Sequence, residues 1–600
     1  MKKIQVYSLF IAFILFPLTL YADDLLSLIE KQSKNDYSTY YKPVAEWSGG
    51  LILPEKNDRE KDGSVWIEIH NTPVKGLRGK ILRLRWDFSK PENAWFNEIR
   101  PDVNIDPKRL DKAKKAKMIL PERVNGWTKV SPLESLAGSH PVDDLEVILK
   151  EPKFSENSLY ISQECSQTKG IEKALVRFSG PSQNGYRLVE HFSNGNFSRD
   201  ITEYVILPPT QKNPSDGQIL TTTDKIERSE LNRYGWYVYG RRIRGIFRVE
   251  SIEPRRLFTA KSIFDVSGAE SCSEWLTDSN YQNLYTGEFR ITSVDPRGKE
   301  KQKGPGNESD SENWKVGKKY LLMHLFGWRK KPGQVVAPGA MFGLVTGHFS
   351  FGTAEVILDE FTGEKRFDIE YHQVYAHSSG GIISGTHKWN SYMGSLFNGW
   401  SNTVPVFDTI IDIPELETYS PAGITIHPLK GLQRELEKMQ AVYRTGAGTG
   451  ISEVRPDVSC VQDSHAALYS ALTSFEQTVI RHPELRKWLF SANSSDPDIR
   501  RFIRLKNLVK QIENMLSFLG IVRCDWKNNY ADPLGVRDPS FAEKIIRPLL
   551  SSGNVFPRSA TDRLYKLAIK NGYPMWTLLS VQIGGEITGF VPLAPTSLTK

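Results

Sequence analysis

Apolar and polar positions follow one pattern in the first half of the chain and another toward its end. From Asp23 to about Ala260, apolar residues alternate or cluster in short runs between turn residues, which is typical of β-strands. The runs are at 66–70, 80–86, 173–180, 186–192 and 245–252. A helical pattern interrupts them at 106–118, and residues 181–185 have the composition of a turn.

A polar stretch at 297–313 separates this half from the rest. It has no apolar anchor and contains a Gly-Pro pair, so we expect a solvated linker. Beyond it, strands are expected at 335–345, 348–358 and 366–375, and the turn-rich segment 359–364 joins the last two as a hairpin. Helical spacing begins near Lys430 and ends at the glycines of 446–450. Further helices are expected at 461–481, 498–519 and 558–570, with a strand at 576–584.

The 600 residues exceed what one hydrophobic core supports, so several domains are expected. We predict a multidomain α+β chain with β-rich amino-terminal domains, an α+β core and a helical carboxy-terminal region. The expected divisions are a signal peptide at 1–22, β-rich domains at 23–151 and 152–296, the linker at 297–313, the core at 314–482, and a helical region and tail at 483–600.

The first 22 residues have the composition of a secretory signal. Lys2 and Lys3 precede an apolar run that ends at Ala22, so we expect cleavage before Asp23 and export into a bacterial envelope, with a retained anchor as the alternative. No later run reaches the ~18 apolar residues of a membrane span, so the mature chain is expected to be periplasmic or envelope-associated without a transmembrane region.

The formal charge of +8 falls by two when both lysines are removed, which leaves a mild basic excess. This excess permits attraction to anionic envelope polymers, and no nucleic-acid motif accompanies it.

Four cysteines, Cys165, Cys272, Cys460 and Cys524, allow three pairings into two bridges in an oxidising compartment. The simplest pairing joins Cys165 to Cys272, which lie in the same half of the chain. Cys460 and Cys524 then form a second bridge or remain free.

Two residues carry a candidate chemistry. Cys460 begins the amphipathic helix expected at 461–481, where the helix dipole and free N–H groups favour the nucleophilic thiolate. His348 opens the strand GHFSFGTAEVI and is a candidate general base. The alternatives are a buried or bridged cysteine and a structural histidine.

Three short motifs resemble the circularly permuted branch of the papain-like thiol hydrolases, the NlpC-type peptidases and their acyltransferase relatives. They are PGQV at 332–335, Gly347-His348, and SCVQD at 459–463, within a segment of about 318–482. The resemblance implies a papain-like core in which His348 is the base and Cys460 the nucleophile. A third residue would orient His348 from the next strand, with His377 as first choice and His372 and Glu370 behind it.

The sequence departs from that family at Gln334, where an acidic residue is usual, and at Ser459, where Asn is frequent. The chain also resembles large exported bacterial proteins labelled CAAX-type (Abi) proteases. That label implies an intramembrane metalloenzyme with paired glutamates, and because this sequence has no Glu-Glu pair, we do not transfer the chemistry.

These observations predict an exported cysteine hydrolase or peptidase that cleaves amide or ester bonds in envelope material, with peptidoglycan peptides as one candidate substrate. No cofactor is expected. The residues Trp389, Tyr392, Phe397 and Trp400 are candidates for a saccharide- or peptide-binding groove, with a core or domain interface as the alternative.

Two other functions remain open. One is a non-catalytic envelope-binding or scaffold protein with a relic core, which a Cys460–Cys524 bridge would favour. The other is a metal-dependent hydrolase in which three histidines hold zinc. Its candidate ligands are His348, His372, His377 and His387, although no His-Glu-x-x-His motif occurs.

Overall fold

The structure is a computed structural model. It describes residues 27, 32, 35–89, 123, 130–140, 142–180, 185–209, 211–212, 219–221, 223–277, 289–298, 302–306, 314–326, 340–341, 344–345, 348–374, 377–378, 381–382, 384–397, 406–444, 460–491, 495–517 and 557–580. The signal peptide, the helix expected at 106–118, Trp400 and Cys524 lie outside the described residues.

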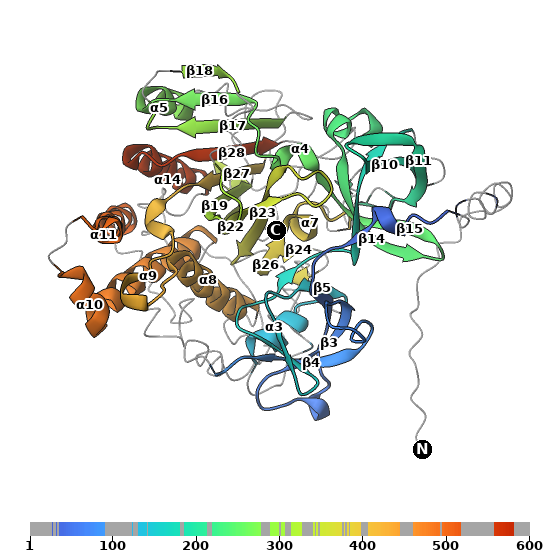
Figure 1. Cartoon of the computed structure of the whole chain (residues 1–600), viewed down its shortest axis with the longest axis horizontal. Helices are drawn as coiled ribbons and strands as arrows, with labels where there is room; N and C mark the ends of the chain where they lie inside the picture. Colours follow the sequence, from blue (N-terminus) through green and yellow to red (C-terminus); the bar gives the residue numbers. More distant parts are fainter. Residues whose placement is uncertain are drawn as a thin grey trace.

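The chain has a mixed α+β structure that is dominated by one long sheet (Figure 1). Its first half contains, in spatial order, β18 (Gln302–Pro305), β16 (Phe264–Ser267), β17 (Phe289–Asp295), β28 (Met575–Ser580), β27 (Val406–Ile411), β19 (Lys319–Phe326), β22 (His348–Leu358) and β23 (Lys365–Gln373). The sheet continues through β26 (Gly385–Lys388), β8 (Ser166–Gln167), β5 (Leu145–Ile148), β2 (Ser48–Ile52), β3 (Val65–Asn71), β4 (Ile81–Trp86), β7 (Ser158–Ile161) and β6 (Lys153–Ser155).

A second sheet has the order β1 (Lys42–Pro43), β9 (Glu172–Phe178), β10 (Tyr186–Ser193), β11 (Asn196–Ile206), β15 (Ile246–Pro254) and β14 (Trp236–Ile243). Three short pairs are separate from both sheets: β12 (Gln211–Lys212) with β13 (Ile219–Thr221), β20 (Ala340–Met341) with β21 (Leu344–Val345), and β24 (His377–Ser378) with β25 (Gly381–Ile382). The large sheets therefore draw heavily on the amino-terminal half, as the alternation predicts.

Helices gather toward the carboxy-terminal end of the chain. The longer ones are α8 (Pro428–Arg444), α9 (Cys460–Arg481), α11 (Pro497–Ser517) and α14 (Pro557–Asn571). Shorter helices are α3 (Pro132–Ala137), α4 (Arg255–Phe258), α5 (Ala269–Thr277), α7 (Trp389–Tyr392) and α10 (Pro483–Leu489), with 3-10 turns at Ser38–Tyr40, Lys56–Asp58, Ile226–Arg228, Glu230–Tyr234, Pro414–Leu416 and Pro421–Gly423. The four helices expected after residue 430 are confirmed as α8, α9, α11 and α14. None of the helices described here combines the length and apolarity that a membrane crossing requires.

Strand β22 lies between two apolar cores because its side chains alternate between the faces of the sheet. Phe349 and Phe351 belong to the core that also contains Leu468 of α9. Val356 belongs to the core that contains Trp236 of the second sheet. The long sheet is thus covered by helices on one side of β22 and by the second sheet on the other, which Figure 1 shows as α8 and α9 opposite β14 and β15.

The hairpin from β22 to β23 has the turn that its composition predicts. The Oδ1 atom of Asp359 accepts hydrogen bonds from the backbone N–H groups of Phe361 (3.0 Å) and Thr362 (2.8 Å), and Gly363 has a φ of 71°. An aspartate that satisfies the backbone of its own turn, followed by a glycine in the left-handed region, fixes a tight reversal. This turn sets which residues of β23 lie beside His348.

The expectations for the linker and for the cysteine pairing differ from the structure. Residues 302–305, within the expected linker, form β18 and pair with β16, because backbone hydrogen bonding to an edge strand needs no apolar side chain. Cys165 and Cys272 are both free, and they lie in different cores, so the expected Cys165–Cys272 bridge was wrong.

A buried ion pair fastens helix α8 to the amino-terminal β strands. The Nη2 of Arg444 lies 2.6 Å from Oε2 of Glu164, Nη1 lies 3.1 Å from Oε1, and neither side chain is exposed. The remaining N–H groups of Arg444 reach the Ser384 carbonyl, the Ser135 hydroxyl and the Pro132 carbonyl at 3.1–3.3 Å. Every donor is satisfied, which is the condition under which a buried charge is tolerated.

We predict that Arg444→Met lowers the free energy of unfolding by about 3–5 kcal/mol, because it leaves the Glu164 carboxylate buried without a cation. Urea unfolding followed by circular dichroism measures the loss. The control Lys319→Met breaks an ion pair with Glu355 in which both side chains are at least one-third exposed, and should cost less than about 1 kcal/mol. Equal losses in the two variants would contradict the prediction.

Candidate functional site

The Cys460 thiol lies at the first residue of α9, against the beginning of β22. The backbone N–H groups of Phe349 and Val461 both hydrogen-bond the sulfur and act to lower its pKa. Burial acts in the opposite direction and is the larger effect, so the pKa of Cys460 is raised to about 11. The helix terminus was expected to favour the thiolate, and this expectation is wrong for the resting structure because the sulfur is removed from water.

The His348 imidazole is completely buried and has one ordered partner. Its Nε2 hydrogen-bonds Oε1 of Gln373 on β23. An amide oxygen only accepts, so Nε2 carries the hydrogen and Nδ1 holds the lone pair. Nδ1 has no hydrogen-bond partner among the described residues. Burial, and then the neighbouring His324, lower the pKa of His348 to about 3, so the ring is neutral at physiological pH.

Cys460 and His348 meet at the same end of β22 but make no hydrogen bond to each other within the described part of the chain. The His348 ring follows the parity of Val356 and leaves the sheet on the face opposite α9. The thiol contacts the backbone of the next residue, Phe349. The two reactive groups are therefore brought to one strand end from two sides of the sheet.

A chain of buried polar groups continues from His348 on its face of the sheet. His324 of β19 lies with its ring centroid 6.3 Å from that of His348. Its Nδ1 is 2.6 Å from Oδ1 of Asp408, and its Nε2 is 3.3 Å from the hydroxyl of Tyr392. The Tyr371 hydroxyl donates to the other Asp408 oxygen at 2.6 Å. These contacts are suited to holding His324 in one orientation and one tautomer.

Tyr392 connects this polar chain to the cysteine. The pKa of its hydroxyl is raised well above its usual range, first by burial, then by Asp408 and then by Cys460. The thiol is therefore close enough to act electrostatically on Tyr392, which itself contacts His324. We call His348 and the Asp408–His324–Tyr392 group, together with the buried Cys460 thiol on the other face of the sheet, the strand-end cluster.

The residue that orients His348 in the structure is Gln373, which the sequence reasoning did not select. The hairpin register pairs Phe351 with His372, so position 348 faces 375 rather than 376. His372 points to the other face and bonds Thr386 at 3.0 Å, while Glu370 contacts Lys150 and Ser166. His377 lies in β24, and its side chain is outside the described residues, so its role stays a prediction.

His324 and Asp408 were not among the site residues predicted from the sequence. Their signal was a polar residue inside the apolar runs YLLMHLF and VFDTII, because a buried polar side chain requires a partner. Each run alone gives only half of the pair. The partner becomes visible when β19 and β27 are placed side by side, with His324 opposite Asp408.

The histidines proposed for a metal site do not converge. His348 and His372 project from opposite faces of the sheet, and His387 bonds Ser391 at 3.1 Å. Within the described ranges, no group of three His, Cys, Asp or Glu side chains has the geometry to hold a metal ion. Of the aromatic residues proposed for substrate binding, Tyr392 belongs to the strand-end cluster, and Trp389 lines a separate cavity.

We predict that Gln373→Glu raises the pKa of His348 from about 3 toward neutrality, because a carboxylate at Nε2 stabilises the imidazolium. Imidazole resonances followed by NMR across pH measure the change. Gln511→Glu, at the contact of α11 with Asn571, serves as the control and should leave His348 unaltered. An unchanged His348 titration in Gln373→Glu would show that Gln373 does not hold the ring.

Buried histidines also predict a loss of stability in acid. His348, His372 and His465 each have a pKa lowered to about 3 by burial, so the unfolded chain binds more protons than the folded one below pH 6.5. Each should reduce the free energy of unfolding by about 2 kcal/mol between pH 6.5 and pH 5. Neither ring nitrogen of His465 has a hydrogen-bond partner among the described residues. The free energy of unfolding of His465→Leu should therefore fall by about 2 kcal/mol less over that interval than that of the unaltered chain. Urea unfolding at both pH values provides the test, and an unaltered pH dependence would contradict it.

Comparison with known proteins does not assign the chain to a family. A scan against protein-family models, a search of curated proteins and a search of solved structures each found no match. The case for any activity of this chain therefore depends on its own residues and their geometry.

Proposed function

We propose that the chain is an exported thiol hydrolase in which Cys460 attacks the carbonyl carbon of an amide or ester in envelope material. The observation that supports it best is the meeting of Cys460 with β22. A backbone N–H of the residue after His348 hydrogen-bonds the thiol, and on the other face of the sheet Nδ1 of His348 has no partner among the described residues. A cysteine at a helix start beside a histidine strand is the arrangement of a papain-like core, the fold we propose for 314–482.

The proposed reaction starts from a neutral pair. At neutral pH both the thiol and the imidazole are uncharged, because burial raises the pKa of Cys460 and lowers that of His348. For this step the thiol, on the α9 face of the sheet, would have to reach Nδ1 of His348 around the end of β22. The sulfur would then give its proton to Nδ1 as the S–C bond forms, with Gln373 holding the ring at Nε2. The leaving amine or alcohol takes that proton, and water then cleaves the thioester.

The same backbone groups that contact the thiol would stabilise the transition state. The backbone N–H groups of Phe349, Val461 and Cys460 each act to lower the pKa of the thiol. Backbone N–H groups beside a nucleophile can donate hydrogen bonds to the carbonyl oxygen and so stabilise the negative charge that develops on it. The Asp408–His324–Tyr392 group would keep the surroundings of the His348 ring rigid.

A second candidate is a non-catalytic envelope-binding protein, and burial is the observation that favours it. His348 is fully buried, Cys460 is 6% exposed, and the thiol is hard to ionise. Cys460 is free rather than bridged within the described residues, so its sulfur remains available for chemistry. The two candidates differ in whether Cys460 can be acylated.

We predict that p-nitrophenyl acetate transiently acetylates Cys460, which intact-protein and peptide mass spectrometry would detect together with a burst of nitrophenol. His348→Asn should slow acylation by about 10²–10⁴-fold, because it removes the general base. With both groups neutral, the rate should vary little from about pH 5 to about pH 9.

Cys272 is the internal control for this experiment. It is also a buried, free thiol with a pKa raised to about 12, but it lies within α5 and away from His348. Cys460→Ser should abolish the burst, and Cys272→Ser should preserve it. Equal labelling of the two cysteines, or none, would overturn the hydrolase and leave the binding protein as the better account.

A further inference from the structure

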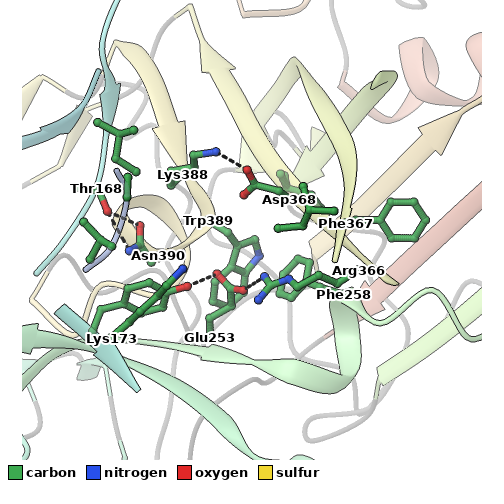
Figure 2. Close-up of a pocket in the computed structure, with 16 residues that line it drawn as sticks. Thr168, Lys173, Glu253, Phe258, Arg366, Phe367, Asp368, Lys388, Trp389 and Asn390 are labelled. Carbon is green, nitrogen blue, oxygen red and sulfur yellow. Dashed lines mark hydrogen bonds and ion pairs between the residues drawn. The ribbon is translucent and has the colours of Figure 1, made fainter. Parts of the chain in front are cut away.

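A polar cavity lies between the long sheet and the second sheet (Figure 2). Its volume is about 270 Å³, and its walls come from β5 and β9, from the β14–β15 pair, from β23, and from α7 at the end of β26. Its lining residues differ from those of the strand-end cluster, although both sites include residues of β22 and α7. Cavities at the junction of structural units are frequent ligand sites.

Every cationic side chain on the cavity wall already has a carboxylate partner. Arg366 pairs with Glu253 and lies 3.6 Å from Asp359. Lys388 lies 2.7 Å from Asp368 and 3.0 Å from Glu370. Lys173 lies 2.6 Å from Glu360. Among the described residues the cavity therefore has many charged side chains and no uncompensated one, and neither an anion nor a cation is favoured.

An apolar ligand is also disfavoured. An apolar ligand would displace water from the charged groups without offering them new hydrogen bonds. A buried polar group that is left without a hydrogen bond raises the free energy of the complex. The cavity instead offers both donors and acceptors for hydrogen bonds. Asn390 and Thr168 bond each other at 3.0–3.2 Å across one side, and the Arg366 Nε is a buried donor that has no partner among the described residues.

Aromatic surface completes the wall. Trp389 and Phe258 pack edge to face with ring centroids 5.3 Å apart, and Figure 2 shows Trp389 between the Arg366–Glu253 pair and Asn390. The volume is below the usual range for drug-sized ligands, so the ligand must be small. A ligand that is small, uncharged, rich in hydroxyl groups and apolar on one ring face meets all of these conditions.

We propose that this cavity binds a single neutral sugar ring or cyclitol. Its hydroxyl groups would exchange hydrogen bonds with the wall ion pairs and with the Thr168–Asn390 pair, and its C–H face would contact the aromatic rings. Access is from the side of Lys173 and Asp368, whose side chains are 20% and 36% exposed. The proposal does not depend on hydrolase activity.

The test uses three probes of one shape and different charge: glucose, glucuronate and glucosamine, with myo-inositol and N-acetylglucosamine as further neutral ligands. Saturation-transfer NMR and isothermal titration with the full chain measure binding at millimolar concentration. At least one neutral probe should bind more tightly than both charged ones and raise the melting temperature by about 2 °C or more.

Neighbouring lysines provide a matched pair of variants. Lys42 and Lys173 are cross-strand partners that both contact Glu360, but only Lys173 lines the cavity. Lys173→Met and Thr168→Val should each weaken binding about tenfold, while Lys42→Met should not. The proposal is overturned if no neutral probe binds, if glucuronate or glucosamine binds tightest, or if Lys42→Met weakens binding as much as Lys173→Met. Circular dichroism confirms that each variant is folded.

Discussion

The two-residue repeat of strand β22 is the constraint on which the rest of the structure depends. It sends Phe349 and Phe351 into the helical core and His348 and Val356 toward the second sheet. A shift of one residue would exchange these sets, place a phenyl ring among polar groups and bury His348 against apolar helix surface. The same repeat directs the His348 ring away from the face on which α9 carries the Cys460 thiol. The two groups can therefore approach each other only around the end of the strand.

Burial decides the electrostatics of the strand-end cluster. Local features around Cys460 favour an ionised thiol: a helix start and converging N–H groups. Removal from water outweighs them, and it likewise keeps His348 uncharged. In the reaction that we propose, the neutral thiol would therefore lose its proton to the neutral imidazole during bond formation rather than before it. In the cavity, by contrast, each cationic side chain is paired with a carboxylate, so both groups remain charged. Because these charges compensate each other, we expect the cavity to select uncharged ligands.

The sequence predicted local structure better than long-range assembly. The helix of α9, the bounds of β22 and the hairpin after it follow from periodicity and turn chemistry, which act over a few residues. Gln373 was missed because choosing between it and its neighbours requires the register to within one residue. His324 and Asp408 are 84 positions apart and meet only through the pairing of β19 with β27. The cavity could not be predicted, because its wall combines strands from three parts of the chain.

The pairings that close the long sheet have a consequence for how the chain is made. Strand β8 pairs with β26, where Ser166 faces Thr386, and β17 pairs with β28, where Phe289 faces Ser580. During synthesis the earlier strand of each pair emerges hundreds of residues before its partner. Its exposed edge then offers unpaired N–H and C=O groups to other chains. Such long-range closure slows folding, so this protein should depend on protection of its nascent edges more than a chain whose strands pair with near neighbours in sequence.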